Sequence, residues 1–242
     1  GMFGKLIARD SRPAQEIINE ALSVASKSDV IVAALGESAE MTGESSSRSI
    51  INIPDAQEDL LKALVKTGKP LVLVLFTGRP LTLKWEQDNV PAILNVWFGG
   101  TEAGNAIGDV LFGDVTPSGK LTTTWPQNVG QIPLYYNHKN TGRPYEGGNP
   151  KFKSDYLDVD NSPLYPFGYG LSYTTFTYDT IQLSQHIVRS GQSITASVMV
   201  KNTGNMAGEE TVQLYIRDLV GSVTRPVKEL KGFEMVALKK GE

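Results

Sequence analysis

The apolar run at residues 71–76 constrains the fold most, because all of its side chains are apolar. A strand that is apolar on both faces must be covered on both faces. A central strand of a parallel sheet, with helices on each side, meets this condition. Residues 30–35 and 92–97 form two further runs of the same character. These runs predict the buried strands of an α/β domain.

Helical patterns alternate with these runs. Residues 17–25 carry apolar side chains at helical spacing, which predicts a helix before the first strand. Pro54 and the acidic residues after it are typical of the first turn of a second helix, and Gly68 is typical of a helix stop. A third helix is expected to follow the glycine pair at residues 99–100 and to end near Gly113.

These patterns predict a domain organisation. We expect an N-terminal segment over residues 1–13 and a three-layer α/β sandwich with a mostly parallel sheet over residues 14–126. Residues 127–173 lack periodicity but are rich in aromatic residues, so an ordered connecting segment is expected rather than a disordered linker. Apolar and polar residues alternate over residues 174–242, which indicates an antiparallel sandwich. A complete immunoglobulin-like sandwich needs roughly 100 residues, so this one is expected to be partial.

Composition excludes several function classes. The net charge is -3 with acids and bases interspersed, so we expect no nucleic-acid partner. No apolar stretch approaches the roughly 20 residues of a membrane span, and cysteine is absent. His138 and His186 lack a ligand spacing, and residues 155–160 lack the glycine and glutamate of a calcium loop, so neither a metal nor a cofactor is expected. Residues 113–121 depart from a phosphate-binding loop in spacing.

The loop after the first strand, residues 37–48, holds three glutamates: Glu37, Glu40 and Glu44. In open α/β sheets, ligands bind outside the carboxyl ends of the strands, so this loop is placed for chemistry. Spacing alone favours a solvated acidic face over a catalytic role, since charge clusters are commonly structural. A general acid must be protonated at the working pH, which requires burial or nearby negative charge. Glu37 and Glu40 are close enough in sequence to supply charge beside Glu44.

Several motifs together resemble a known family. They are the loop from Gly36 to Arg48, Ile53-Pro54, Gly78-Arg79-Pro80-Leu81, residues 97–104, residues 109–114, residues 117–121, residues 165–173 and residues 225–233. In this order they resemble the C-terminal half of bacterial periplasmic β-glucosidases of glycoside hydrolase family three. The resemblance covers nearly the whole chain after Ala14.

The resemblance implies an architecture and a catalytic role. In that family a (β/α)8-type barrel precedes an α/β sandwich and a fibronectin type III domain, so this chain would hold the second domain and part of the third. The nucleophilic aspartate lies on the barrel, and too few residues precede Pro13 for a barrel, so the isolated chain is expected to be inactive. The family pattern places the general acid/base on Glu44. Arg48 is a candidate for orienting Glu44 or for contacting a sugar hydroxyl, although an ordinary ion pair is an equal alternative.

Three hypotheses follow. The first is the acid/base portion of a retaining β-glucosidase that hydrolyses terminal non-reducing β-D-glucosyl residues. Its partners would be a β-glucoside or oligosaccharide and the N-terminal barrel, in the periplasm or outside the cell. The second is a non-catalytic carbohydrate-binding or interaction module. The third, a nucleotide-binding domain, is disfavoured by the failed phosphate motif. Unpaired strand edges of a partial sandwich would also favour a homodimer.

Overall fold

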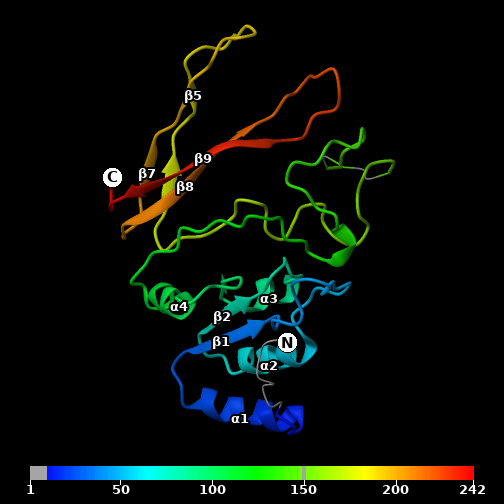
Figure 1. The fold of residues 1–242 in the computed structure, drawn as a ribbon, viewed down its shortest axis with the longest axis vertical. Coiled ribbons are helices and arrows are strands. Elements are labelled where there is room, and N and C mark those ends of the chain that lie inside the picture. The colour runs from blue at the N-terminus through cyan, green and yellow to red at the C-terminus, as the bar shows by residue number, and fades with distance from the viewer. Residues whose placement is uncertain (1–9, 146, 149–150) are drawn as a thin grey trace. The chain divides into compact units, whose positions relative to one another are not determined.

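The computed structural model describes residues 10–145, 147–148 and 151–242 (Figure 1). Contacts divide the described residues into two compact units. The first comprises those within 10–104, 123–135 and 143–166, and the second comprises residues 105–122, 136–142 and 167–242. The helices are α1 (Ala14–Ser26), α2 (Asp55–Val65), α3 (Lys84–Asn89), α4 (Ala103–Phe112) and the 3-10 helix η1 (Val129–Gln131). The strands are β1 (Ile31–Gly36), β2 (Leu71–Phe76), β3 (Ala92–Asn95), β4 (Phe176–Tyr178), β5 (Gln182–Leu183), β6 (Ala196–Ser197), β7 (Val200–Asn202), β8 (Gly208–Ile216) and β9 (Glu229–Leu238).

The first unit is built on a parallel sheet with the strand order β1-β2-β3 (Figure 1). β2 lies in the middle, where both of its edges are paired and both of its faces are covered. Leu73 and Leu75 in this strand are completely buried. The predicted α/β class is therefore confirmed, and the strand at residues 71–76 has the bounds that the apolar run predicts.

The helices of this unit follow the predicted signals. α2 contacts both β1 and α1. The Gly68 amide donates to the Val65 carbonyl (3.1 Å), and Gly68 has a positive φ of 71°. A left-handed residue after the last turn is the usual glycine stop, so this prediction is confirmed. The sequence reasoning missed α3, a six-residue helix without a side-chain cap. Its Trp85 ring lies 5.4 Å from the Lys62 ammonium on α2.

The third strand is shorter than its apolar run predicts. The run extends to Trp97, but β3 ends at Asn95. Trp97 has a φ of 51°, so the chain leaves the extended conformation there. Its ring lies 5.8 Å from the ring of Trp125, which is almost fully buried. The prediction of a strand through residue 97 is wrong because the tryptophan turns toward an aromatic contact instead of continuing the ladder.

The second unit contains antiparallel strands. β8 and β9 form the longest pair, with a register shift between Leu214 and Tyr215, and β4 pairs with β7 and β5 with β6. The alternation at residues 212–216 lies within β8, as predicted. Of residues 194–200, only Ala196, Ser197 and Val200 belong to strands, so the first alternating stretch is confirmed in part. The small antiparallel sheets are consistent with a fibronectin type III-like region.

A buried asparagine joins several segments of this unit. Asn202 is fully buried, and its side-chain oxygen accepts from the Thr174 hydroxyl (2.7 Å) and the Gly204 amide (3.1 Å). Its side-chain nitrogen donates to the carbonyls of Met206 (2.8 Å) and Leu238 (3.1 Å). One side chain therefore hydrogen-bonds four polar groups, which come from three segments of the chain.

We expect Asn202→Ala to destabilise the second unit by about 2 to 3 kcal/mol, because it leaves buried donors and acceptors without partners. Faster amide hydrogen exchange in β8 and β9 would report the loss. The control is Asn205→Ala, an exposed position three residues away, which should change exchange little. Equal protection in both variants would contradict the expected role of Asn202.

Candidate active site

The carboxyl ends of β1 and β2 lie at one edge of the parallel sheet. Gly36, the last residue of β1, is paired with Phe76, the last residue of β2. The segments that follow these strands therefore leave the sheet side by side. This places the acidic loop at residues 37–48 next to Thr77, Gly78 and Arg79.

Gly36 fixes the point at which the loop begins. Its amide donates to the Gln57 side-chain oxygen (2.6 Å), and its carbonyl accepts from the Gln57 side-chain nitrogen (2.9 Å). Its φ is 135°, and a Cβ atom added there would lie 1.9 Å from the Phe76 carbonyl oxygen. Only glycine fits this close approach of two strands.

Glu37 is an internal anchor of the loop and not a solvated acid. It is 4% exposed, and its carboxylate contacts two arginines, with Oε1 at 2.8 Å from Arg48 Nη1 and 3.0 Å from Arg79 Nε. Oε2 accepts from the Thr77 hydroxyl (2.9 Å) and the Gly78 amide (3.2 Å). The buried charge is therefore paired and hydrogen-bonded, as buried charges must be.

Two opposing influences act on the Glu37 carboxyl. Burial, the largest, raises the pKa of Glu37. Hydrogen bonds from Arg48, Thr77 and the Gly78 amide, with the charge of Arg79, lower the pKa and outweigh burial. The net pKa lies below the usual value of a glutamate, so Glu37 stays ionised in the folded protein at neutral pH.

This shift predicts an acid-sensitive contribution to stability. A carboxyl whose pKa is lower in the folded state stabilises the fold fully above the unfolded-state pKa, about 4.3, and loses that contribution as the pH falls through the folded-state pKa. Glu37→Gln should cost about 2 kcal/mol at pH 7, and the difference from the parent chain should shrink on acidification below the unfolded-state pKa. Urea unfolding followed by tryptophan fluorescence measures this. A difference that is constant with pH would contradict the prediction.

Glu44 lies on an exposed turn of the same loop. The Ser46 amide donates to the Gly43 carbonyl (3.3 Å), and positive φ values at Gly43 (110°) and Ser45 (59°) shape the turn. Glu44 itself is exposed. Among the described residues, no hydrogen bond or ion pair of its carboxylate is found. The group is therefore open to a ligand or to another domain.

Arg48 does not bind Glu44 in this structure. Its guanidinium pairs with Glu37 and donates from Nη2 to the Asn52 carbonyl (3.1 Å). No direct contact supports orientation of Glu44 by Arg48, whereas the ordinary ion pair is present. Contact of Arg48 with a sugar hydroxyl stays a prediction. Glu40 is exposed. Glu37 is thus buried while Glu40 and Glu44 are exposed, a difference that their spacing did not reveal.

The sequence did not indicate that Arg79 would contact the acidic loop. Arg79 was noted only as part of the motif Gly78-Arg79-Pro80-Leu81. Its Nη2 donates to the carbonyls of Met41 (2.6 Å) and Ser46 (2.8 Å), and its Nε contacts Glu37. The position of Arg79, three residues after β2, could have indicated this contact. A residue shortly after the second strand of a parallel pair lies beside the loop that follows the first.

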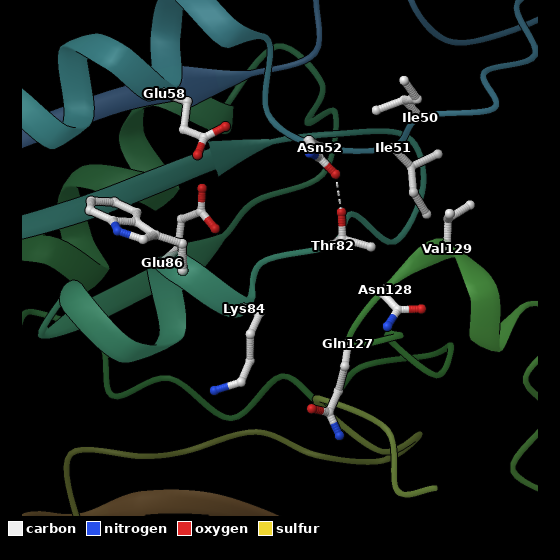
Figure 2. Close-up of a pocket in the computed structure, with 11 residues that line it drawn as sticks. Ile50, Ile51, Asn52, Glu58, Thr82, Lys84, Glu86, Gln127, Asn128 and Val129 are labelled. Carbon is white, nitrogen blue, oxygen red and sulfur yellow. Dashed lines mark hydrogen bonds between the residues drawn. The ribbon is translucent and has the colours of Figure 1, made fainter. Parts of the chain in front are cut away.

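A pocket of about 360 Å³ lies elsewhere in the first unit (Figure 2). Its lining includes Glu58 and Glu86, whose side chains point toward one another, and Asn52, which accepts a hydrogen bond from Thr82 (Figure 2). Burial, with the nearby charge of Glu58, raises the pKa of Glu86. Glu86 is only 3% exposed and Glu58 pairs with Lys62 (2.6 Å). These acids are less accessible to a ligand than Glu44.

Two further observations bear on other classes of site. Within residues 10–145, 147–148 and 151–242, no three side chains of His, Asp or Glu are grouped so that they could hold a metal ion. None of the helices in the described part of the chain combines the length and apolar character needed to cross a bilayer.

The structure thus defines an α/β domain with a candidate site on the loop after its first strand, followed in sequence by a small antiparallel unit. Comparison with known families gives this class a name. Residues 6–173 match the glycosyl hydrolase family 3 C-terminal domain, and residues 210–242 match the fibronectin type III-like domain. The chain belongs to glycoside hydrolase family 3, as its C-terminal domain.

Similar proteins are glycosidases. The chain is 53% identical over its whole length to the periplasmic beta-glucosidase of Salmonella typhimurium, covering 32% of that protein. It is 44% identical to a beta-xylosidase of Formosa agariphila over 92% of the chain and 30% of that protein. The chain thus spans about a third of the length of these relatives.

Solved structures agree. The beta-glucosidase of Listeria innocua in complex with gluconolactone superposes with a TM-score of 0.90 at 44% identity, covering 97% of this chain and 33% of that one. A mutant of the same enzyme in complex with laminaribiose gives a TM-score of 0.88 at 42% identity, with coverages of 98% and 33%. The family assignment therefore rests on both sequence and fold.

Proposed function

We propose that this chain is the acid/base-bearing portion of a longer retaining β-glucosidase, called the full-length enzyme below, which hydrolyses terminal non-reducing β-D-glucosyl residues. A nucleophilic aspartate would come from the N-terminal barrel domain of that enzyme. The observation that carries the proposal is the open carboxylate of Glu44 at the carboxyl edge of the sheet, in the family's acid/base motif.

The chemistry needs two carboxyl groups with different tasks. In the first step, protonated Glu44 gives its proton to the glycosidic oxygen while the nucleophile attacks the anomeric carbon, and the C–O bond to the leaving group breaks. In the second step, ionised Glu44 takes a proton from water, which attacks the glycosyl-enzyme and releases the sugar. Two displacements retain the anomeric configuration. The isolated chain has one of the two groups and should not turn over.

β-Glucosides are the favoured substrates because the relatives named above include β-glucosidases from two different organisms. β-Xylosides are the second candidate, since a beta-xylosidase is 44% identical. The Salmonella relative is a periplasmic beta-glucosidase, which supports a periplasmic location, with secretion as the alternative.

The direct test is hydrolysis of phenyl β-D-glucoside and phenyl β-D-xyloside by the full-length enzyme, with the product anomer followed by proton NMR. We expect faster turnover of the glucoside and β-glucose as the first product. Release of α-glucose first would contradict a retaining mechanism, and faster turnover of the xyloside would move the assignment to a β-xylosidase.

The alternative of a non-catalytic binding module needs its own measurement. Calorimetric titration of the isolated chain with glucose and cellobiose should give little or no heat of binding, because half of a site offers few contacts. Tight binding by the isolated chain, together with an inactive full-length enzyme, would favour the binding module.

A further inference from the structure

The turn that carries Glu44 is held from both sides by one side chain. Arg79 Nη2 donates to the carbonyl of Met41, three residues before Glu44, and to the carbonyl of Ser46, two residues after it. The distances are 2.6 Å and 2.8 Å, within the range of strong charge-assisted bonds. A guanidinium therefore closes the base of the turn.

Arg79 is itself anchored to the sheet edge. Its Nε lies 3.0 Å from Glu37 Oε1, and the other oxygen of Glu37 accepts from Thr77 and Gly78. Glu37 directly follows β1 and Thr77 directly follows β2. The turn is thus connected, through two charged side chains, to the ends of two paired strands.

A second contact between these segments does not involve charge. A Cβ atom added to Gly78 would lie 2.2 Å from the Thr42 hydroxyl oxygen and 3.0 Å from its Cβ. Thr42, the residue after Met41, therefore packs directly against the backbone at Gly78. Hydrogen bonds and close packing act on the same part of the loop.

This support of the turn matters because the Glu44 side chain is not itself held in place. The side chain is exposed, and among the described residues no hydrogen bond or ion pair of its carboxylate is found. The place from which its proton is delivered is then set by the backbone of residues 41–46. A misplacement of about 1 Å can cost about 100-fold in rate.

We propose that Arg79, held by Glu37, is a positioning residue for the acid/base: it fixes the turn at residues 43–46 so that Glu44 reaches the glycosidic oxygen. This inference rests on the proposed function for its catalytic consequence. The brace itself, formed by Arg79, Glu37 and the contact of Gly78 with Thr42, is independent of that function.

The test is Arg79→Lys in the full-length enzyme. Lysine keeps the charge but lacks the planar fork that reaches two carbonyls and a carboxylate together. We expect kcat/KM on phenyl β-D-glucoside, whose leaving group needs a proton, to fall by about 10- to 100-fold. On 2,4-dinitrophenyl β-D-glucoside, whose leaving group needs none, it should change by less than about threefold.

This comparison separates positioning from simple loss of folded protein. A smaller folded fraction lowers kcat/KM equally for both substrates, so equal losses would overturn the proposal. The matched control is Arg189→Lys, at an exposed arginine of the second unit whose backbone amide bonds to Gln192. It should leave both values unchanged.

A second variant and a second measurement guard against misfolding. Gly78→Ala leaves Arg79 in place but pushes Thr42 away, so it should give the same dependence on the leaving group. In the isolated chain, Arg79→Lys should speed amide hydrogen exchange at residues 42–46 while β2 stays protected. Unchanged exchange in the loop would overturn the brace.

The outcomes distinguish the two proposals. If Glu44→Gln shows the leaving-group dependence and Arg79→Lys does not, the positioning function of Arg79 is wrong and the catalytic assignment stands. If Glu44→Gln keeps full activity on both substrates, the proposed function fails, and the exchange experiment still reports on the brace.

Discussion

Glu44→Gln is expected to lower kcat/KM of the full-length enzyme on phenyl β-D-glucoside by about 10²- to 10⁴-fold, the usual contribution of a general acid. Glutamine has a similar shape but cannot give up a proton. On 2,4-dinitrophenyl β-D-glucoside, kcat/KM reports only the first step, which needs no proton, so it should stay within about tenfold of the parent. Steady-state assays with the two substrates provide both numbers.

Two results decide the meaning of this experiment. The control is Glu16→Gln, at an exposed glutamate on α1, which should leave both substrates unaffected. Equal losses on both substrates would point to a general defect and not to proton donation. Unchanged activity on the phenyl glucoside would show that another group provides the proton.

Gly36→Ala should have the largest effect on stability, about 4 kcal/mol. About half comes from forcing a side chain into a positive φ of 135°, and about half from overpacking against the Phe76 carbonyl, which would lie 1.9 Å away. The new Cβ must separate β1 from β2 at the edge where the acidic loop begins. Urea unfolding followed by tryptophan fluorescence measures this loss, because Trp85, Trp97 and Trp125 all lie in the first unit.

Gly43→Ala is the matched control for the clash. Gly43 also has a positive φ, 110°, but a Cβ atom added there would meet nothing within 4 Å. Its cost should therefore be limited to the conformational part, about 1 to 3 kcal/mol. If both variants lost the same stability, the clash with Phe76 would not contribute to the cost of Gly36→Ala, and the proposed reason for glycine at position 36 would be wrong.

The scaffold was predictable because its signals are local. The run at residues 71–76 is apolar throughout, and only a central strand covered on both faces explains that pattern. Proline and acids indicated the start of α2, which begins at Asp55, and the predicted stop, Gly68, lies three residues after its last residue, Val65. A six-residue helix such as α3 has no comparable pattern, since it completes fewer than two turns.

The environment of the site was only partly predictable. Position after a strand and the resemblance to a family motif singled out Glu44 as the candidate acid/base, but the same reasoning treated Glu37 only as a neighbouring charge. Glu37 is buried because Arg79, distant in sequence, comes beside it where β1 and β2 pair. Glu37 and Arg79 are close only because β1 and β2 are neighbours in the sheet. Three similar apolar runs in a sequence do not specify the order of the strands.

Arg48 illustrates the same limit. Its nearness in sequence to Glu44 suggested a contact, yet it binds Glu37 and the Asn52 carbonyl. A buried carboxylate without a partner is costly, whereas water already solvates an exposed one. Pairing of the arginine with the buried carboxylate of Glu37 is therefore more favourable than pairing with Glu44. The burial of Glu37, and not its distance in sequence, explains why Arg48 pairs with it.

The most direct test of the central claim is the distance between two carboxyl groups in a crystal structure of the full-length enzyme with a bound glucoside analogue. A retaining mechanism with Glu44 as acid/base predicts a separation of about 5 to 5.5 Å between Glu44 and the nucleophilic aspartate of the barrel, one on each side of the anomeric carbon. A separation beyond about 6.5 Å, or a different carboxyl group against the glycosidic oxygen, would contradict the account.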